Sequence, residues 1–361
     1  MNEVEEIEEL TRRLVGIPSY EDETEAGDFI EDWLRDETDA QVSVELDDAG
    51  NVLAWHGDSA EVALVGHHDT VPPDEGQIDD GVPTVEKRDG RLYGRGTADM
   101  KGALAAAMVA FRDASAADTA FASFVGEESG GIGAKHATSN GFVPNRAVVT
   151  EGSLGYSSSD AFDVAVAHRG RRELRVVARG EAKHAGDADD ESNAVYSAVD
   201  SINRIRRYES PTVEVGVDGE DDSFDIGGSL TVTGIRSRDE TTNIVPSRCE
   251  FVVDERTVPG APPYDLDELE AEASVVDEMP PMECDDSGFA KTVREAARST
   301  GTSEFVVKPH ATDAGWLSQA GSSCVVCGPA ERGEAHTDDE SVSVNSLVRA
   351  ERVYRRVLEI S

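Results

Sequence analysis

Short apolar runs alternate with helix-like segments over most of this 361-residue chain. Examples of the runs are "EVALVG" and "FASFVG", and the segments between them carry apolar residues at helical spacing. This alternation leaves few architectures open, because consecutive parallel strands need a helical crossover. We therefore predict an α/β fold with a mostly parallel sheet. Its strands should include residues 41–46, 51–55, 61–67, 119–126, 146–151, 304–307 and 322–327, and its helices residues 4–15, 24–35, 100–114, 129–139, 287–299 and 344–358.

The pattern changes between residues 163 and 277. The alternating segment 162–180 is typical of an antiparallel strand open on one face. Further along we expect helices at 192–207 and 265–274, strands at 228–237 and 248–255, and a solvated acidic loop at 218–225. This pattern indicates a smaller inserted α+β domain. The predicted division is a catalytic domain of residues 1–162 and 278–361, and an inserted domain of residues 163–277.

The formal net charge of the chain is −41, and the acidic residues are spread over its whole length. Six lysines stand among the 33 basic residues. A folded protein with such an acidic, lysine-poor surface resembles proteins from a salt-saturated cytoplasm, so we expect a halophilic source. The charge argues against nucleic-acid binding, which needs a basic surface. No stretch approaches the roughly 20 apolar residues of a membrane span, and the acidic N-terminus lacks a signal-peptide pattern, so we expect a cytoplasmic location.

Several residues that can bind a metal lie immediately after predicted strands. They come from distant parts of the chain, but the carboxyl ends of parallel strands meet at one edge of a sheet. A mixture of imidazole and carboxylate ligands suits zinc or a similar ion. Each residue alone is weak evidence, and their joint placement is what indicates a metal site. The candidates are His67, Asp69, Asp99, Glu127, Glu128, Glu151 and His336.

Four motifs occur in a recognisable order: "GHHDTVP", "LYGRGTADMKG", "FVGEESGGIGA" and "AHTDDESV". Together they resemble the co-catalytic dizinc exopeptidase and deacylase family. That family includes acetylornithine deacetylase, succinyl-diaminopimelate desuccinylase, aminoacylase and several di- and carboxypeptidases. The resemblance covers nearly the whole chain. It implies a zinc-exopeptidase catalytic domain with an inserted lid and dimerisation domain, and hydrolysis of a linear amide bond.

The resemblance also implies two divalent metal ions, with zinc expected first and cobalt or manganese as alternatives. His67 and Glu151 would hold one ion, Glu128 and His336 would hold the other, and Asp99 would bridge both.

Two further residues have implied catalytic roles. Asp69 would hydrogen-bond His67 and fix its tautomer. Glu127 would be the general base, taking a proton from a metal-activated water and passing it to the leaving amine.

The inserted domain carries motifs of the same family. "RGEAKHAGDADDESNAV" resembles the lid segment, in which His184 would donate to the developing oxyanion, commonly across a homodimer interface. The segments "TTNIVP", "DERTVPG", "VAHRG" and "PHATDAGWL" resemble substrate-binding segments. An arginine fork suits a substrate carboxylate. The implied substrate contacts are Asn243, Arg256, Arg169 and Thr312, with Asp313 beside the last.

Two of these segments depart from the family. The loop after His184 lacks the usual proline, and His310 and Ala311 replace residues of the familiar "GTSDA" segment.

We expect the remaining arginines of the 162–180 segment to form a solvated strand face. They are Arg171, Arg172 and Arg175.

The leading functional hypothesis is an amidohydrolase that releases an amino acid from a small N-acyl amino acid. One alternative is a hydrolase that releases lysine or ornithine from an amino-group carrier protein. Such hydrolases often lack a clear N-x-I-P motif, which "NIVP" matches, and a −41 surface would attract an acidic carrier poorly. Another alternative is a metallo-dipeptidase or tripeptidase. A non-catalytic binding protein would have lost metal ligands or Glu127, and this chain keeps them all.

The two adjacent histidines in "LVGHHDTVP" should have different roles. On an extended chain His67 and Asp69 project to one side and His68 to the other. We therefore expect His67 to be the ligand and His68 to be dispensable for metal binding.

The charge generates a prediction about stability. Self-repulsion among the acidic residues destabilises the compact state unless salt screens it. We expect the melting temperature, measured by circular dichroism, to rise between dilute buffer and multimolar KCl. An unchanged melting temperature would contradict this interpretation.

Overall fold

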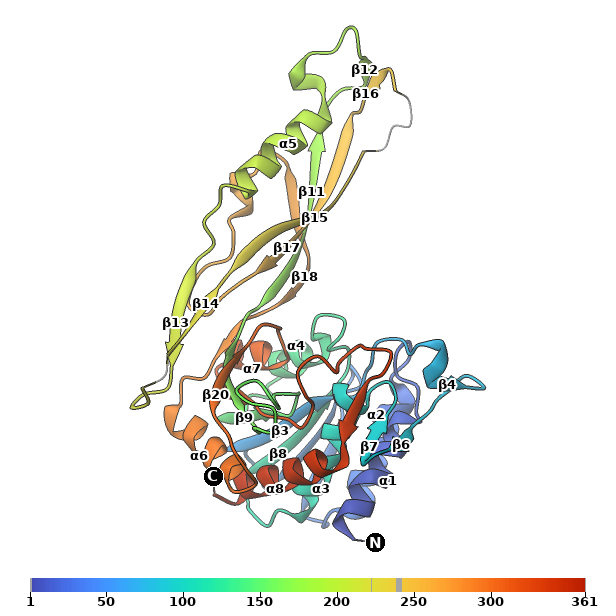
Figure 1. Cartoon of the computed structure of the whole chain (residues 1–361), viewed down its shortest axis with the longest axis vertical. Coiled ribbons are helices and arrows are strands. Elements are labelled where there is room, and N and C mark those ends of the chain that lie inside the picture. Colours follow the sequence, from blue (N-terminus) through green and yellow to red (C-terminus); the bar gives the residue numbers. More distant parts are fainter. Residues whose placement is uncertain (1, 222, 238–241, 361) are drawn as a thin grey trace. The chain divides into compact units, whose positions relative to one another are not determined.

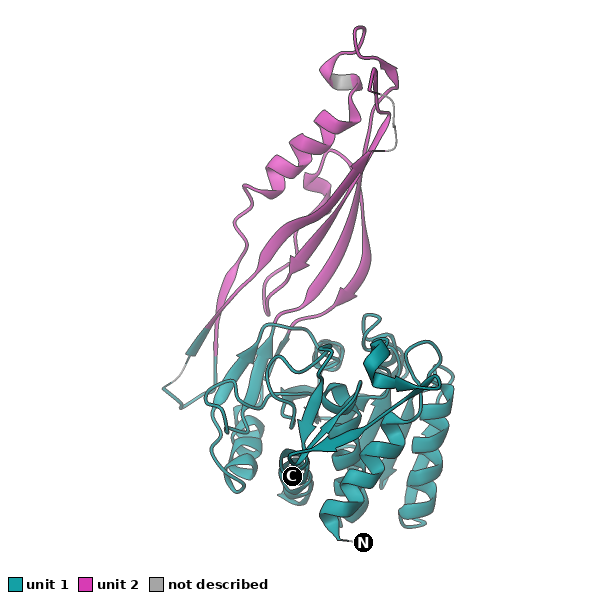
Figure 2. Cartoon of the chain, turned by 45° about the vertical axis from the view of Figure 1, so that its right-hand side comes forward, with its two compact units in different colours: residues 1–168, 216–224, 282–361 teal, residues 169–215, 225–281 magenta. Residues whose placement is uncertain are grey.

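The computed structural model describes residues 2–221, 223–237 and 242–360. The chain forms two compact units, coloured separately in Figure 2. Unit 1 comprises Met1–His168, Gly216–Phe224 and Met282–Ser361, and unit 2 comprises Arg169–Val215 and Asp225–Pro281. The first boundary lies six residues later than the sequence pattern indicated, because the strand Val164–His168 pairs within the sheet of unit 1.

The sheet of unit 1 is mixed, with its parallel strands together in the middle (Figure 1). Strands β8, β3, β9 and β21 are parallel neighbours. The pairs β1–β2 and β2–β8 on one side, and β21–β10 and β10–β19 on the other, are antiparallel. The predicted α/β class is therefore confirmed, but the sheet is mixed rather than mostly parallel, because its outer strands pair antiparallel. The strands are β1 (Val42–Leu46), β2 (Val52–His56), β8 (Thr119–Phe124), β3 (Val62–His67), β9 (Arg146–Val149), β21 (Ser323–Val326), β10 (Val164–His168) and β19 (Met282–Glu283), with β20 (Phe305–Lys308) parallel to β10.

Helices cover both faces of this sheet, because successive strand residues point to opposite sides. In β3, Val62 and Leu64 join the core on one face, and Ala63 and Val65 join the core on the other. The first core contains α1 (Glu3–Val15), α2 (Thr24–Glu37), α3 (Gly102–Asp113), α6 (Ser287–Arg298) and α8 (Val344–Ile360). The second contains α4 (Ile132–Ser139) and α7 (Ala314–Ala320).

Short elements complete unit 1. Strands β6 (Glu86–Arg88), β7 (Arg91–Tyr93) and β22 (Ser341–Ser343) form a small antiparallel sheet. A 3₁₀ turn spans Glu75–Gln77, and β4 (Ile78–Asp79) pairs with β5 (Val82–Pro83). A π-helical turn, Thr97–Lys101, leads into α3. None of the described helices is long and apolar enough to cross a membrane.

Unit 2 is an antiparallel four-stranded sheet with one helix packed on it. Its strand order is β15 (Ser229–Ser237), β17 (Arg248–Arg256), β11 (Arg171–Arg179) and β18 (Glu272–Met279). Helix α5 (Ala194–Ile205) buries Ala194, Ala198 and Ile205 against Val176 and Phe251 of the sheet. Two short pairs are β12 (Lys183–His184) with β16 (Ile244–Val245), and β13 (Thr212–Gly216) with β14 (Ser223–Gly227).

The structure corrects three local predictions. The segment 265–274, expected as a helix, is a 3₁₀ turn (Leu266–Glu268) followed by β18. Its residues favour helix, but β18 forms the edge of the sheet and its pairing with the inner strand β11 decides its conformation. The expected acidic loop 218–225 ends in β14, and the alternating segment 162–180 divides into β10 and β11 in separate sheets.

Arg172 was expected on a solvated strand face, and this prediction was wrong. Its side chain is buried and its Nη1 donates to Glu255 Oε2 at 2.8 Å. Burial of an arginine requires such a partner, because an unpaired buried charge is strongly destabilising. Arg175 is exposed, as expected, whereas Arg171 is half-buried and donates to Asp277 and Glu173.

Candidate metal centre

The carboxyl ends of three parallel strands carry most of the candidate ligands. His67 is the last residue of β3, and Asp69 follows it by two residues. Glu127 and Glu128 follow β8, and Glu151 follows β9. Because β3 lies between β8 and β9 and is parallel to both, these ends lie at the same edge of the sheet. Segments distant in sequence therefore deliver their side chains to one place.

Asp69 connects two of these segments. Its Oδ1 lies 3.1 Å from His67 Nδ1, and its two carboxylate oxygens accept the backbone N–H groups of Glu127 and Glu128 at 3.1 and 3.0 Å. The first contact leaves Nε2 of His67 free to point toward Asp99. Asp69 is thus placed to orient the imidazole and to fix the backbone that carries both glutamates.

Asp99 lies between the two candidate histidine ligands. Its Oδ1 is 3.2 Å from His67 Nε2, and its Oδ2 is 3.3 Å from His336 Nε2. His336 Nε2 is also 2.7 Å from Glu128 Oε1. Asp99, Glu128 and His336 can each offer one ligand atom, and these atoms lie within 4.8 Å of one another. A carboxylate that contacts both histidines has the placement expected of a bridging ligand.

Hydrogen bonding at these residues shifts their pKa values in opposite directions. Burial of Asp99 would raise its pKa, but the contacts with His336 and His67 hold that pKa far below its usual range. The same contacts with Asp99 and Glu128 raise the pKa of His336 to about 10.

Glu127 and Glu151 are surrounded by other acidic groups. Burial and then the neighbouring Glu151 raise the pKa of Glu127 well above its usual value. Burial raises the pKa of Glu151, although Lys308, with Nζ at 3.1 Å from Oε2, opposes the shift. The other oxygen of Glu151, Oε1, is buried and has no hydrogen-bond partner among the described residues. This excess of buried carboxylates, with one oxygen unpartnered, fits divalent cations.

Two residues that the sequence analysis did not identify hold the turn that carries Asp99. Glu340 is fully buried, and its Oε1 accepts the backbone N–H groups of Ala98 and Asp99 at 3.0 and 3.2 Å. Its Oε2 accepts from Arg95 Nη1 at 2.7 Å. Burial raises the pKa of Glu340 to about 7. The feature of the sequence that could have identified Glu340 is its position shortly after His336 in the motif "AHTDDE".

The glycines after Glu128 allow helix α7 to approach closely. Gly131 has a φ of +66°, and a Cβ there would lie 2.8 Å from both Asp313 Oδ1 and the Trp316 ring. Trp316 Nε1 donates to the carbonyl of Gly130 at 3.0 Å. Asp313 is buried beside this loop, and Thr312 is also buried, with its Oγ1 3.1 Å from His168 Nε2. Thr312 therefore presents no open surface for a substrate contact.

The remaining candidate residues lie in unit 2. His184 is exposed, and its strand β12 pairs with β16, so Ala185 N donates to the carbonyl of Asn243 at 2.8 Å. The structure thus brings the segments of His184 and Asn243 together. Arg256 is half-buried and donates from Nε and Nη2 to the two oxygens of Asp254 at 2.8 and 3.1 Å. Arg169 is half-buried at the start of unit 2.

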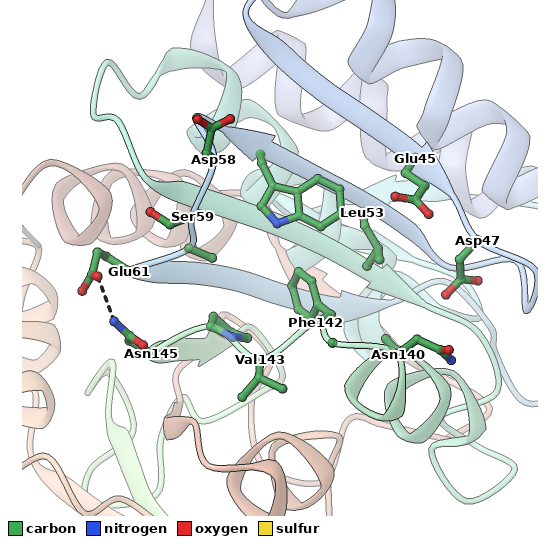
Figure 3. Close-up of a pocket in the computed structure, with 15 residues that line it drawn as sticks. Glu45, Asp47, Leu53, Asp58, Ser59, Glu61, Asn140, Phe142, Val143 and Asn145 are labelled. Atoms are coloured by element: carbon green, nitrogen blue, oxygen red, sulfur yellow. Dashed lines mark hydrogen bonds between the residues drawn. The ribbon is translucent and has the colours of Figure 1, made fainter.

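A cavity of about 420 Å³ lies elsewhere in unit 1 (Figure 3). Trp55 and Phe142 pack edge to face in its lining, and Glu61 accepts from Asn145 at its margin. None of the candidate ligands lines it. We therefore do not associate this cavity with the metal centre.

Comparison with known proteins identifies the family. Residues 63–360 match the model of peptidase family M20/M25/M40. The chain belongs to this family. It is 29% identical over 345 residues to an acetylornithine deacetylase of Myxococcus xanthus, covering 87% of this chain and 85% of that protein. It is 27% identical over 356 residues to a succinyl-diaminopimelate desuccinylase of Acidiphilium cryptum, covering 92% and 89%.

Solved structures show the same fold. The aminopeptidase PepT of Bacillus cereus superposes on this chain with a TM-score of 0.74 at 20% identity, covering 99% of this chain and 98% of that one. A dinuclear metal-binding peptidase of the M20 family from Bacillus subtilis has a TM-score of 0.70 at 16% identity, covering 99% and 97%. The resemblance predicted from the motifs is thus confirmed. The M20 chain is a metallohydrolase that acts on amide or peptide bonds.

His68 occupies a different environment from His67. Its ring is fully buried, with Nδ1 2.8 Å from Ser123 Oγ, and burial lowers its pKa to about 3. Its other ring nitrogen, Nε2, has no hydrogen-bond partner among the described residues and lies 4.0 Å from Glu23 Oε2.

We therefore predict opposite effects for the two histidines. His67→Ala should weaken metal binding by about 100-fold or more, because it removes a ligand, and should abolish metal-dependent activity. His68→Met, which fills the same buried space, should retain most of both. Metal content by atomic emission, measured beside hydrolysis and the melting temperature, checks this. Equal losses in the two variants would show that the assignment is wrong.

Proposed function

We propose that this protein is a metal-dependent amidohydrolase that releases an amino acid from an N-acyl amino acid, like acetylornithine deacetylase and succinyl-diaminopimelate desuccinylase. The observation that carries the proposal is the convergence of His67, Asp99, Glu128 and His336, with Glu151 and Glu127 in the same acidic cluster. The names of the two relatives support the kind of substrate.

The ligand set supports two divalent ions, with zinc proposed first because imidazole nitrogen and carboxylate oxygen both suit it. His67 and Glu151 would hold one ion, Glu128 and His336 the other, and Asp99 both. When bound, such a pair of ions polarises the scissile carbonyl and makes water more acidic.

Glu127 is proposed as the general base. Its carboxylate takes a proton from the attacking water, and the water oxygen bonds to the amide carbon. As the carbon–nitrogen bond breaks, Glu127 passes that proton to the nitrogen of the leaving amine. Burial raises the pKa of Glu127 above its usual value, which makes its carboxylate a stronger base. Asp69 supports the base by holding the backbone N–H of Glu127.

Unit 2 is proposed to supply substrate contacts and the dimer interface. His184 is exposed and can donate to the developing oxyanion. The substrate carboxylate is proposed to be bound by Asn243, Arg256 and Arg169. To bind it, the Arg256 guanidinium would release Asp254, its present partner. Thr312 would act indirectly, by shaping the loop before α7.

A substrate panel tests the proposal. Metal-loaded protein at high salt should be assayed with acetylornithine, succinyl-diaminopimelate, simple di- and tripeptides, and a glutamyl-lysine linked to a carrier protein. We expect release from one of the two small acyl amino acids. Release from the peptides alone, or from the carrier alone, would overturn the proposed substrate class and identify one of the alternatives.

Replacement of the base should separate catalysis from metal binding. We expect Glu127→Ala to keep both ions and to lower turnover by about 10²–10⁴-fold, the usual contribution of a general base. Glu25→Ala, which removes an exposed carboxylate from α2, is the control for the change in charge. Normal turnover by Glu127→Ala would show that the assigned mechanism is wrong.

A further inference from the structure

A buried lysine contacts one of the proposed metal ligands. Lys308 is the last residue of β20, and its side chain is 6% exposed. Its Nζ donates to Glu151 Oε2 at 3.1 Å. Lysine is rare in this chain, with six in 361 residues, and burying an ammonium group is costly without a charged partner. The position therefore calls for an explanation beyond packing of the strand.

The two oxygens of Glu151 have different environments. Oε2 is held by Lys308, whereas Oε1 is buried and has no hydrogen-bond partner among the described residues. Asp99 differs, because each of its oxygens contacts one histidine. Asp69 differs again, because both of its oxygens accept backbone N–H groups. Of these three carboxylates, Glu151 alone has one oxygen held and the other unpartnered.

We propose that Lys308 is a positioning residue of the metal centre: its ammonium group holds Oε2 of Glu151, so that Glu151 offers only Oε1 to a metal ion. The inference rests on the proposed function, since it assumes that Glu151 is a ligand. The ammonium group also prevents Glu151 from turning both oxygens toward the ion. Lys308 therefore acts on the ion held by His67 and Glu151 and leaves the one held by Glu128 and His336 unaffected.

The consequence for metal binding is selective. Removing the partner of a ligating carboxylate typically costs about 10–100-fold in metal affinity. We expect this loss in Lys308→Met and Lys308→Gln, and for one of the two ions only. Lys308→Arg keeps a positively charged donor for Oε2, which neither Met nor Gln supplies, and should recover most of the affinity.

The experiment is a titration of the metal-stripped, full-length protein with zinc, followed by calorimetry and chelator competition. Wild type, the three Lys308 variants and Lys135→Met are compared. Lys135 is an exposed lysine over the Trp316 ring, so its variant controls for loss of one positive charge. Melting temperatures of the metal-free proteins report on folding.

The outcomes separate the two proposals. A selective loss for one ion in the Met and Gln variants, with recovery in the Arg variant, supports the role of Lys308. Unchanged affinities would overturn the role of Lys308 and leave the proposed function standing. So would an equal loss of affinity for both ions together with a lower melting temperature of the metal-free protein. A wild-type protein that binds fewer than two ions would overturn both.

Discussion

The carboxylate of Asp69 is the contact on which the rest of the site depends. It joins the end of β3 to the loop after β8, because it contacts His67 Nδ1 and accepts the backbone N–H groups of Glu127 and Glu128. One buried side chain thereby fixes a proposed ligand, the proposed base and a second ligand relative to one another. The parallel pairing of β3 and β8 makes this possible, since it brings both strand ends to one edge of the sheet.

The second constraint on the site is charge. Burial raises the pKa values of Glu127, Glu151 and Asp313, and the carboxylate of Glu151 raises those of Glu127 and Asp313 further. His67 and Lys308 offset only part of this negative charge. Such a cluster is stabilised by protons or by cations. The hydrogen bonds of Glu340 to the Asp99 turn and of Lys308 to Glu151 hold individual carboxylates in place within it. A dinuclear metal centre is the interpretation that uses all of these features.

Much of unit 1 could be predicted because its signals are local. An apolar strand followed at once by His67 and Asp69, or by Glu127 and Glu128, specifies both the element and the edge at which its polar residues lie. The family motifs then assigned expected roles. The segment 265–274 was mispredicted because its helix-forming residues are outweighed by pairing with β11. Arg172, Glu340 and Lys308 could not be placed, because their partners lie 83, 242 and 157 residues away.

Unit 1 is proposed to hold two metal ions through residues from five separate segments. Crystals of the zinc-loaded protein, measured at the zinc absorption edge, test this most directly. We expect two anomalous peaks per chain, one beside His67 and Glu151, the other beside Glu128 and His336, with Asp99 between them. A single peak, or peaks away from these residues, would contradict it.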